Sequence, residues 1–143
     1  PGFGGAEVLQ SEIWFYHGTS KIWDTSDVYI ELWNGDSMGP VAQLDQTMLT
    51  AVHYAPVYAT YSPGVEVEAN FWLVVNTEMS AEAYPSSLGD GAGSAVSHSY
   101  YSDDLIIWEP WIPPTGISNY FMAVEVDPLA LDGTTWGSLK ATF

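Results

Sequence analysis

The stretch Val65–Asn76, VEVEANFWLVVN, carries the clearest structural pattern in the chain. Apolar residues take every second position from Val65 to Val75, and most of the residues between them are polar. Such alternation predicts one continuous β-strand with one face in a hydrophobic core and the other nearer to water. Pro63-Gly64 comes directly before it as a turn signal.

Strand patterns continue on both sides of this stretch. Alternation of the same kind predicts strands over residues 8–17, 27–34, 105–108 and 119–126. Residues 41–53 also fit a helix of three turns, but Pro40 and Pro56 bracket them and their surroundings are β-rich, so strands are favoured. We therefore predict an all-β chain that folds as one antiparallel β-sandwich of jelly-roll type.

The chain has 143 residues, a length that suits a single domain. Residues 1–6 are Gly-rich and are expected to form a flexible lead-in, residues 7–126 the β-sandwich, and residues 127–143 a tail or an extra strand. Residues 86–99 are small and polar and predict a long surface loop.

The charge balance excludes several classes of partner. Lys and Arg number two, Asp and Glu number 18, and the net charge is −16. Two cations cannot neutralise a run of phosphates, so nucleic-acid binding is excluded, and binding to anionic membranes is disfavoured for the same reason. No apolar stretch approaches the roughly 20 residues of a membrane span. The absence of Cys excludes disulfides, zinc-thiolate sites and a thiol nucleophile.

Two segments near the C-terminal end have a familiar pattern. SHSYYSDDLIIWEPW (97–111), followed by NYFMAVEV (119–126), resembles a "SYYSDDG…W…NFMIRA" element of jelly-roll-like β-sandwich modules in bacterial secreted and cell-surface proteins. Segments 13–20, 28–36 and 67–78 stand in the order of the other strands of that module. Leu105 replaces the usual Gly after the paired aspartates. The resemblance implies an extracellular, non-catalytic module.

Residues of catalytic type do not form a convincing set. His17 and His53 lie beside aromatic residues in predicted strands, and His98 lies in the predicted loop, a poor place to hold catalytic geometry. Glu66 and Glu68 would share one strand face about 7 Å apart, which fits a glycosidase pair but also the polar face of an amphipathic strand. We expect no enzymatic activity.

Calcium is the one candidate cofactor, because the chain is rich in oxygen ligands and poor in cations. Asp103 and Asp104 are the leading candidate ligands. The alternative is that such aspartates are turn residues whose side chains bind nearby backbone amides.

The seven tryptophans point to an interaction surface. Trp33 and Trp72 fall on the strand faces opposite the aliphatic residues, so they are candidates for a sugar platform or for a contact with another protein copy. Aromatic enrichment with few charges is typical of interface cores and favours the protein contact.

A missing strand gives the sharpest functional hypothesis. Modules with the element above carry a further strand before the first one seen here, and only residues 1–6 occupy that place. A sandwich short of one strand exposes an edge that invites pairing with another chain, and head-to-tail pairing builds filaments. Trp136, Leu139 and Phe143 are the expected anchors of an inserted tail, although the tail could instead fold onto its own sandwich.

The leading prediction is therefore a non-catalytic subunit of a bacterial surface filament, a head-to-tail homopolymer joined by β-strand addition. The alternative is a carbohydrate-binding or adhesive module of a secreted protein.

Overall fold

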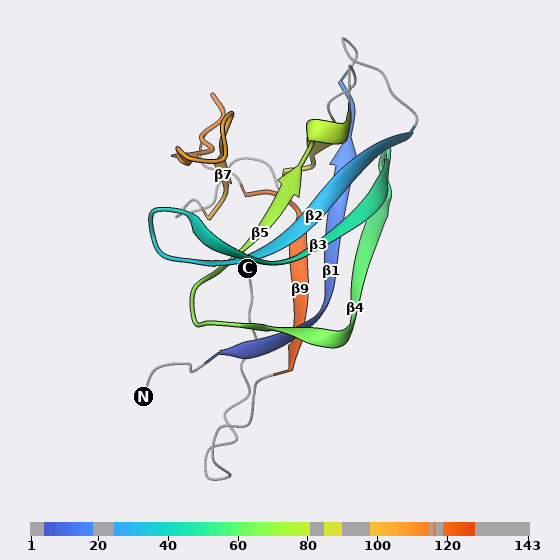
Figure 1. Ribbon diagram of the computed structural model, residues 1–143. Coiled ribbons are helices and arrows are strands. Elements are labelled where there is room, and N and C mark those ends of the chain that lie inside the picture. Colours follow the sequence, from blue (N-terminus) through green and yellow to red (C-terminus); the bar gives the residue numbers. More distant parts are fainter. Residues whose placement is uncertain are drawn as a thin grey trace.

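A computed structural model describes residues 5–18, 25–80, 85–89, 98–114, 116 and 119–127 (Figure 1). These residues form antiparallel strands and one short 3-10 helix, so the prediction of an all-β antiparallel sandwich in one domain is confirmed. The elements are β1 (Ala6–Tyr16), β2 (Thr25–Gly35), β3 (Pro40–Val52), β4 (Pro56–Val67), β5 (Phe71–Asn76), η1 (Glu78–Ser80), β6 (Ser86–Ser87), β7 (Tyr100–Tyr101), β8 (Glu109–Pro110) and β9 (Met122–Asp127).

The strands form two main sheets. In the first sheet β1 is central, with β4 on one side and both β9 and β6 on the other. In the second sheet β2 is central, between β3 and β5. The long strands β3 and β4 follow one another along the chain and pass from the second sheet to the first, as Figure 1 shows. Strands β5 and β9 therefore lie on the opposite side, each at the end of its sheet.

One hydrophobic layer lies between the sheets. Its largest fully buried side chains come from the two central strands and include Phe15 and Ile13 of β1 with Ile30 and Leu32 of β2. The only polar side chain fully buried beside them on β1 is Ser11, whose hydroxyl lies 3.2 Å from the hydroxyl of Tyr61. Together, the two central strands thus contribute the largest apolar side chains that hold the two sheets against one another.

A β-bulge in β1 changes which residues face this layer. The register of β1 shifts between Val8 and Gln10 against both β4 and β9. Before the bulge Ala6 and Val8 are buried, and after it Ser11 and the odd-numbered residues beyond it are buried. The prediction of unbroken alternation over residues 8–17 was therefore wrong, because the extra residue at a bulge moves the following side chains to the other face.

The prediction of one strand over Val65–Asn76 was wrong. The chain leaves the first sheet after Val67 and enters the second sheet at Phe71. At this crossover the side-chain oxygen of Asn34 accepts the backbone N–H of Glu68 at 2.9 Å. Odd-numbered residues face the core in both strands, so the sequence alternates without a visible break although the strands belong to different sheets.

The strand predictions for residues 41–53 and 105–108 had different outcomes. Residues 41–53 are extended and nearly all lie in β3, which confirms the choice of strand over helix. Residues 105–108 are not a strand, since Leu105 has a backbone φ of 61° and the carboxylate of Asp104 accepts the N–H groups of Ile106 and Ile107. This turn bends the chain at the apolar residues for which the sequence had predicted an extended strand.

Some predicted segments lie wholly or partly outside the described residues. These are the lead-in 1–6 apart from its last two residues, most of the predicted loop 86–99, and the tail 127–143 beyond Asp127. Among the residues that the structure describes, no helix is long and apolar enough to cross a membrane.

Candidate interaction surface

The two sides of the sandwich differ in how fully they bury the inward side chains of their end strands. On the β3/β4 side, Ala51 and Ala59 are fully buried and Val67 is 4% exposed. On the opposite side, the inward residues of the end strands are only partly buried; they are Phe71, Leu73 and Val75 of β5 with Met122 and Val124 of β9. Some inward residues of β3 and β4 are also partly buried, but neither β5 nor β9 contributes a fully buried inward residue. On this side, therefore, all the inward apolar residues of both end strands keep part of their surface exposed.

The backbone of β5 has one unpaired edge within the described part of the chain. Gly35 of β2 donates its N–H to the carbonyl of Asn70, 3.2 Å away, directly before β5. In an antiparallel pair, alternate residues turn their N–H and C=O away from the partner strand. With the register of β2 and β5, those residues are Phe71, Leu73 and Val75. No backbone hydrogen bond joins them to another described segment.

A groove of about 660 Å³ lies beside the end of β5. One wall is Val75–Glu78, and the other is Ser102–Leu105. Its charged side chains are the carboxylates of Glu78, Asp103 and Asp104, so the groove is acidic. One of its lining residues, Val75, also packs against the core.

The second wall belongs to an arm, residues 98–112, that stands to one side of the sheets beyond β5 (Figure 1, labelled β7). The arm is a small hairpin in which β7 pairs with β8, and the hydroxyl of Tyr101 donates to the carboxylate of Glu109 at 2.6 Å. Trp111 at its base donates its backbone N–H to the carbonyl of Ser99.

Aromatic contacts fasten the arm to the second sheet. Trp72 of β5 packs edge-on against Tyr100, with ring centroids 5.0 Å apart, and lies 5.8 Å from Trp108. Two glycines of the β2–β3 turn make room for these rings, since a Cβ on Gly35 would lie 2.7 Å from Trp72 and one on Gly39 2.8 Å from Trp108. The arm and the groove wall thus depend on one tightly packed cluster.

At the tip of the arm, Leu105, Ile106 and Ile107 are exposed, and Ile106 reaches 81%. Asp104 shapes this tip by accepting the backbone N–H groups of both isoleucines, and these hydrogen bonds lower the pKa of its carboxyl. Asp104 therefore acts as the turn residue considered above. No group of three or more candidate ligands is found among the described residues, and the calcium site at Asp103 and Asp104 stays a prediction.

The structure brings Trp33 and Trp72 together as directly opposed residues on the outer face of the second sheet. The indole N–H of Trp33 donates to Glu31 at 2.8 Å. Glu31 is only 2% exposed and also accepts hydrogen bonds from the side-chain amides of Gln46 and Asn76. The outward placement of both tryptophans was predicted; their role in an interface stays a prediction.

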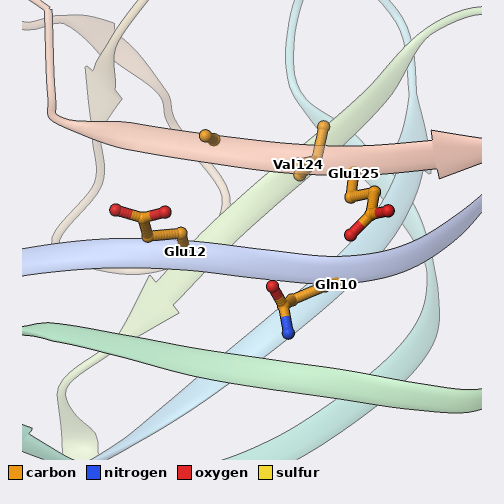
Figure 2. A pocket seen from close by; sticks show the side chains of 5 residues that line it. Gln10, Glu12, Val124 and Glu125 are labelled. Atoms are coloured by element: carbon orange, nitrogen blue, oxygen red, sulfur yellow. The ribbon is translucent and has the colours of Figure 1, made fainter.

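The outer face of the first sheet has a shallow hollow of about 220 Å³ beside the small side chain of Ala123. Figure 2 shows Glu12 and Glu125 well apart along this hollow, with the carboxylate of Glu12 pointing away from Glu125. Glu12 accepts the indole N–H of Trp14 at 2.6 Å. The two carboxylates do not face one another across a common point, as a glycosidase pair would.

Apart from one stacked pair of histidines, the residues of catalytic type are also dispersed. His17 and His53 stack with ring centroids 3.6 Å apart, and Nδ1 of His53 accepts the backbone N–H of His17. Glu66 faces solvent in β4, while Glu68 lies beyond the end of that strand. His98 is at the base of the arm, where its backbone N–H donates to Asn119.

Trp136, Leu139 and Phe143 lie outside the described residues. Sequence reasoning missed Tyr100 and Trp108 as the anchors of the arm. Both belong to the SYYSDD…W element that was noticed for its resemblance, so a signal was present but without an assigned structural role.

Comparison with protein-family models, with curated proteins and with solved structures found no match for this chain.

Substituting Gly35→Ala should loosen the aromatic cluster, because the added Cβ would meet Trp72 and the carbonyl oxygen of Gly39. We expect a loss of about 1–3 kcal/mol in the free energy of unfolding, as for other overpacked sites, and a changed near-ultraviolet circular dichroism spectrum. Gly18→Ala is the matched control, since no heavy atom lies within 4 Å of its Cβ position. Equal denaturation midpoints for the two variants would contradict this packing.

The stability contributed by Tyr120, which follows the arm, should depend on alkaline pH. Burial raises the pKa of Tyr120 to about 12, and its ring stacks on Trp111 at 4.5 Å. An unfolded tyrosine ionises near pH 10, so the stability from the protonated group is complete below that pH and is lost as pH rises toward 12. Circular dichroism of Tyr120→Phe should show a smaller loss of stability over this interval, and a profile identical to wild type would refute the assignment.

Proposed function

We propose that this chain is a non-catalytic structural protein of the bacterial cell surface, the repeating subunit of a filament assembled by β-strand addition. The observation that carries the proposal is the incomplete cover of the core between β5 and β9. A strand added there from another copy would bury apolar area and pair free backbone groups in one step.

The arm supports the same role. Leu105, Ile106 and Ile107 are all more than 45% exposed at its tip. Soluble monomers rarely expose contiguous apolar patches unless they are contact surfaces. Because Asp104 and the Tyr101–Glu109 hydrogen bond fix the arm, its apolar residues are ordered before any partner arrives, which lowers the entropic cost of association.

Head-to-tail geometry follows if donor and acceptor are different parts of the subunit, because such contacts do not close on themselves. Trp136, Leu139 and Phe143 remain the proposed anchors of the donor, and Trp33 and Trp72 the aromatic residues on the acceptor side. The cell-surface location rests on the resemblance of residues 97–126 to bacterial secreted modules.

Purified full-length protein should form filaments that are visible by negative-stain microscopy, and light scattering should show large species whose fraction grows with concentration. A chain ending at Asp132 loses the three anchors and should stay monomeric with an unchanged circular dichroism spectrum. Full-length protein that remains monomeric at high concentration would rule out the filament.

Glycan binding is the second candidate, and the outer face of the first sheet favours it. Tyr58 lies opposite Glu12 in the register of β1 and β4, and the ring of Trp14 packs edge-on against Phe121. In the hollow of Figure 2, Gln10 and Glu125 offer polar groups. Aromatic faces beside amide and carboxylate groups suit the apolar faces and hydroxyl groups of sugars.

A glycan array separates the two candidates. If this face binds sugars, the signal should fall at least tenfold in Tyr58→Ala, whose ring is 46% exposed, and should persist in Tyr54→Ala, which removes an exposed tyrosine at the β3–β4 turn. Trp33→Ala and Trp72→Ala test the second sheet in the same way. An array without signal removes this candidate.

A further inference from the structure

We propose that residues 138–143 of one copy bind as an added strand along the free edge of β5 in the next copy, with Lys140 over the acidic groove. The inference rests on the proposed function and deepens it by naming the donor segment and the acceptor edge.

The acceptor edge is ready for pairing. Phe71, Leu73 and Val75 turn their backbone N–H and C=O groups away from β2, and no described backbone group meets them. Their side chains face the core but stay partly exposed. A new strand would therefore form a ladder with three residues of β5 while its own inward side chains cover these three.

The donor has the matching pattern. Residues 138–143, SLKATF, alternate polar and apolar residues, with Leu139, Ala141 and Phe143 on one face of an extended strand. Laid beside β5, this face would continue the inward row of Phe71, Leu73 and Val75. The other face would then carry Ser138, Lys140 and Thr142 on the outside of the sandwich.

Charge supports the same pairing. The groove at the end of β5 is lined by three carboxylates, those of Glu78, Asp103 and Asp104. The chain has only two Lys or Arg residues, Lys21 and Lys140, and Lys140 lies on the polar face of the donor segment. The hollow beside β9 is lined by two carboxylates, those of Glu12 and Glu125, against three in the groove beside β5. Attraction between opposite charges would therefore favour β5 over β9 as the place for Lys140.

The connection is long enough to reach another subunit. Strand β9 ends at Asp127, so residues 128–137 precede the donor segment. Extended, ten such residues span roughly 30–35 Å, which is about the size of a small domain.

Disulfide trapping tests the pairing directly, because the chain contains no native Cys. Full-length Leu139→Cys is mixed with full-length Leu73→Cys or Val75→Cys, two acceptor sites that cover neighbouring registers. After oxidation, mass spectrometry should identify peptides that join position 139 to position 73 or 75, since only Cα atoms within about 7 Å can be bridged. Val124→Cys on β9 is the matched control edge, and Thr60→Cys on the exposed outer face of the first sheet is the background.

The outcomes separate the inference from the function on which it rests. Filaments that trap position 139 on β9, or on no tested strand, would overturn the β5 acceptor while self-assembly stands. The absence of any oligomer would overturn both. A chain that carries both Leu139→Cys and Val75→Cys and closes into an oxidised monomer, while the mixed single variants do not cross-link, would show that the tail completes its own sandwich.

A charge reversal adds a second readout. Lys140→Glu should raise the concentration at which filaments form by roughly threefold to tenfold, as expected for loss of a surface ion pair with added repulsion. Lys21→Glu makes the same change in net charge and should leave the concentration for filament formation close to that of wild type. Lys140→Arg keeps the positive charge and should assemble like wild type. Equal effects of Lys140→Glu and Lys21→Glu would overturn the contact with the groove.

Discussion

Burial of the apolar layer between the two sheets is the constraint on which the rest of the structure depends. The central strands β1 and β2 bury their inward apolar side chains fully, and the β3–β4 connection closes one side. The other side ends in β5 and β9, whose inward residues keep part of their surface in water. Apolar surface that stays in water does not contribute to the stability of the fold. A further strand on this open side would bury it and so add stability.

The arm changes what that open side offers to a partner. Its aromatic anchors Tyr100 and Trp108 close over Trp72 because Gly35 and Gly39 leave them room. The same packing holds Asp103 and Asp104 opposite the end of β5, so that a plain sheet edge becomes an acidic groove. Edge strands without such a neighbour accept many partners, whereas a groove of defined charge selects among them.

The fold class could be predicted from the sequence because alternation with period two is a direct consequence of strand geometry. The pattern was less informative where the chain departs from that geometry. The crossover after Val67 could not be predicted, because inward residues keep a regular spacing across it. The β1 bulge could not be predicted either, because no residue type in the sequence identifies the extra residue. At Leu105, a positive φ with capping by Asp104 overrode an apolar run.

The candidate site was predicted only in part, for a related reason. Trp33 and Trp72 could be assigned to outer faces from their own strands, but the pairing of β2 with β5 and the approach of the arm are contacts between distant segments. Hydrogen exchange of the β5 amides, compared between dilute monomer and assembled protein, tests the central claim most directly. The account predicts strong slowing at Phe71, Leu73 and Val75 on assembly, and unchanged exchange at these three amides in assembled protein would contradict it.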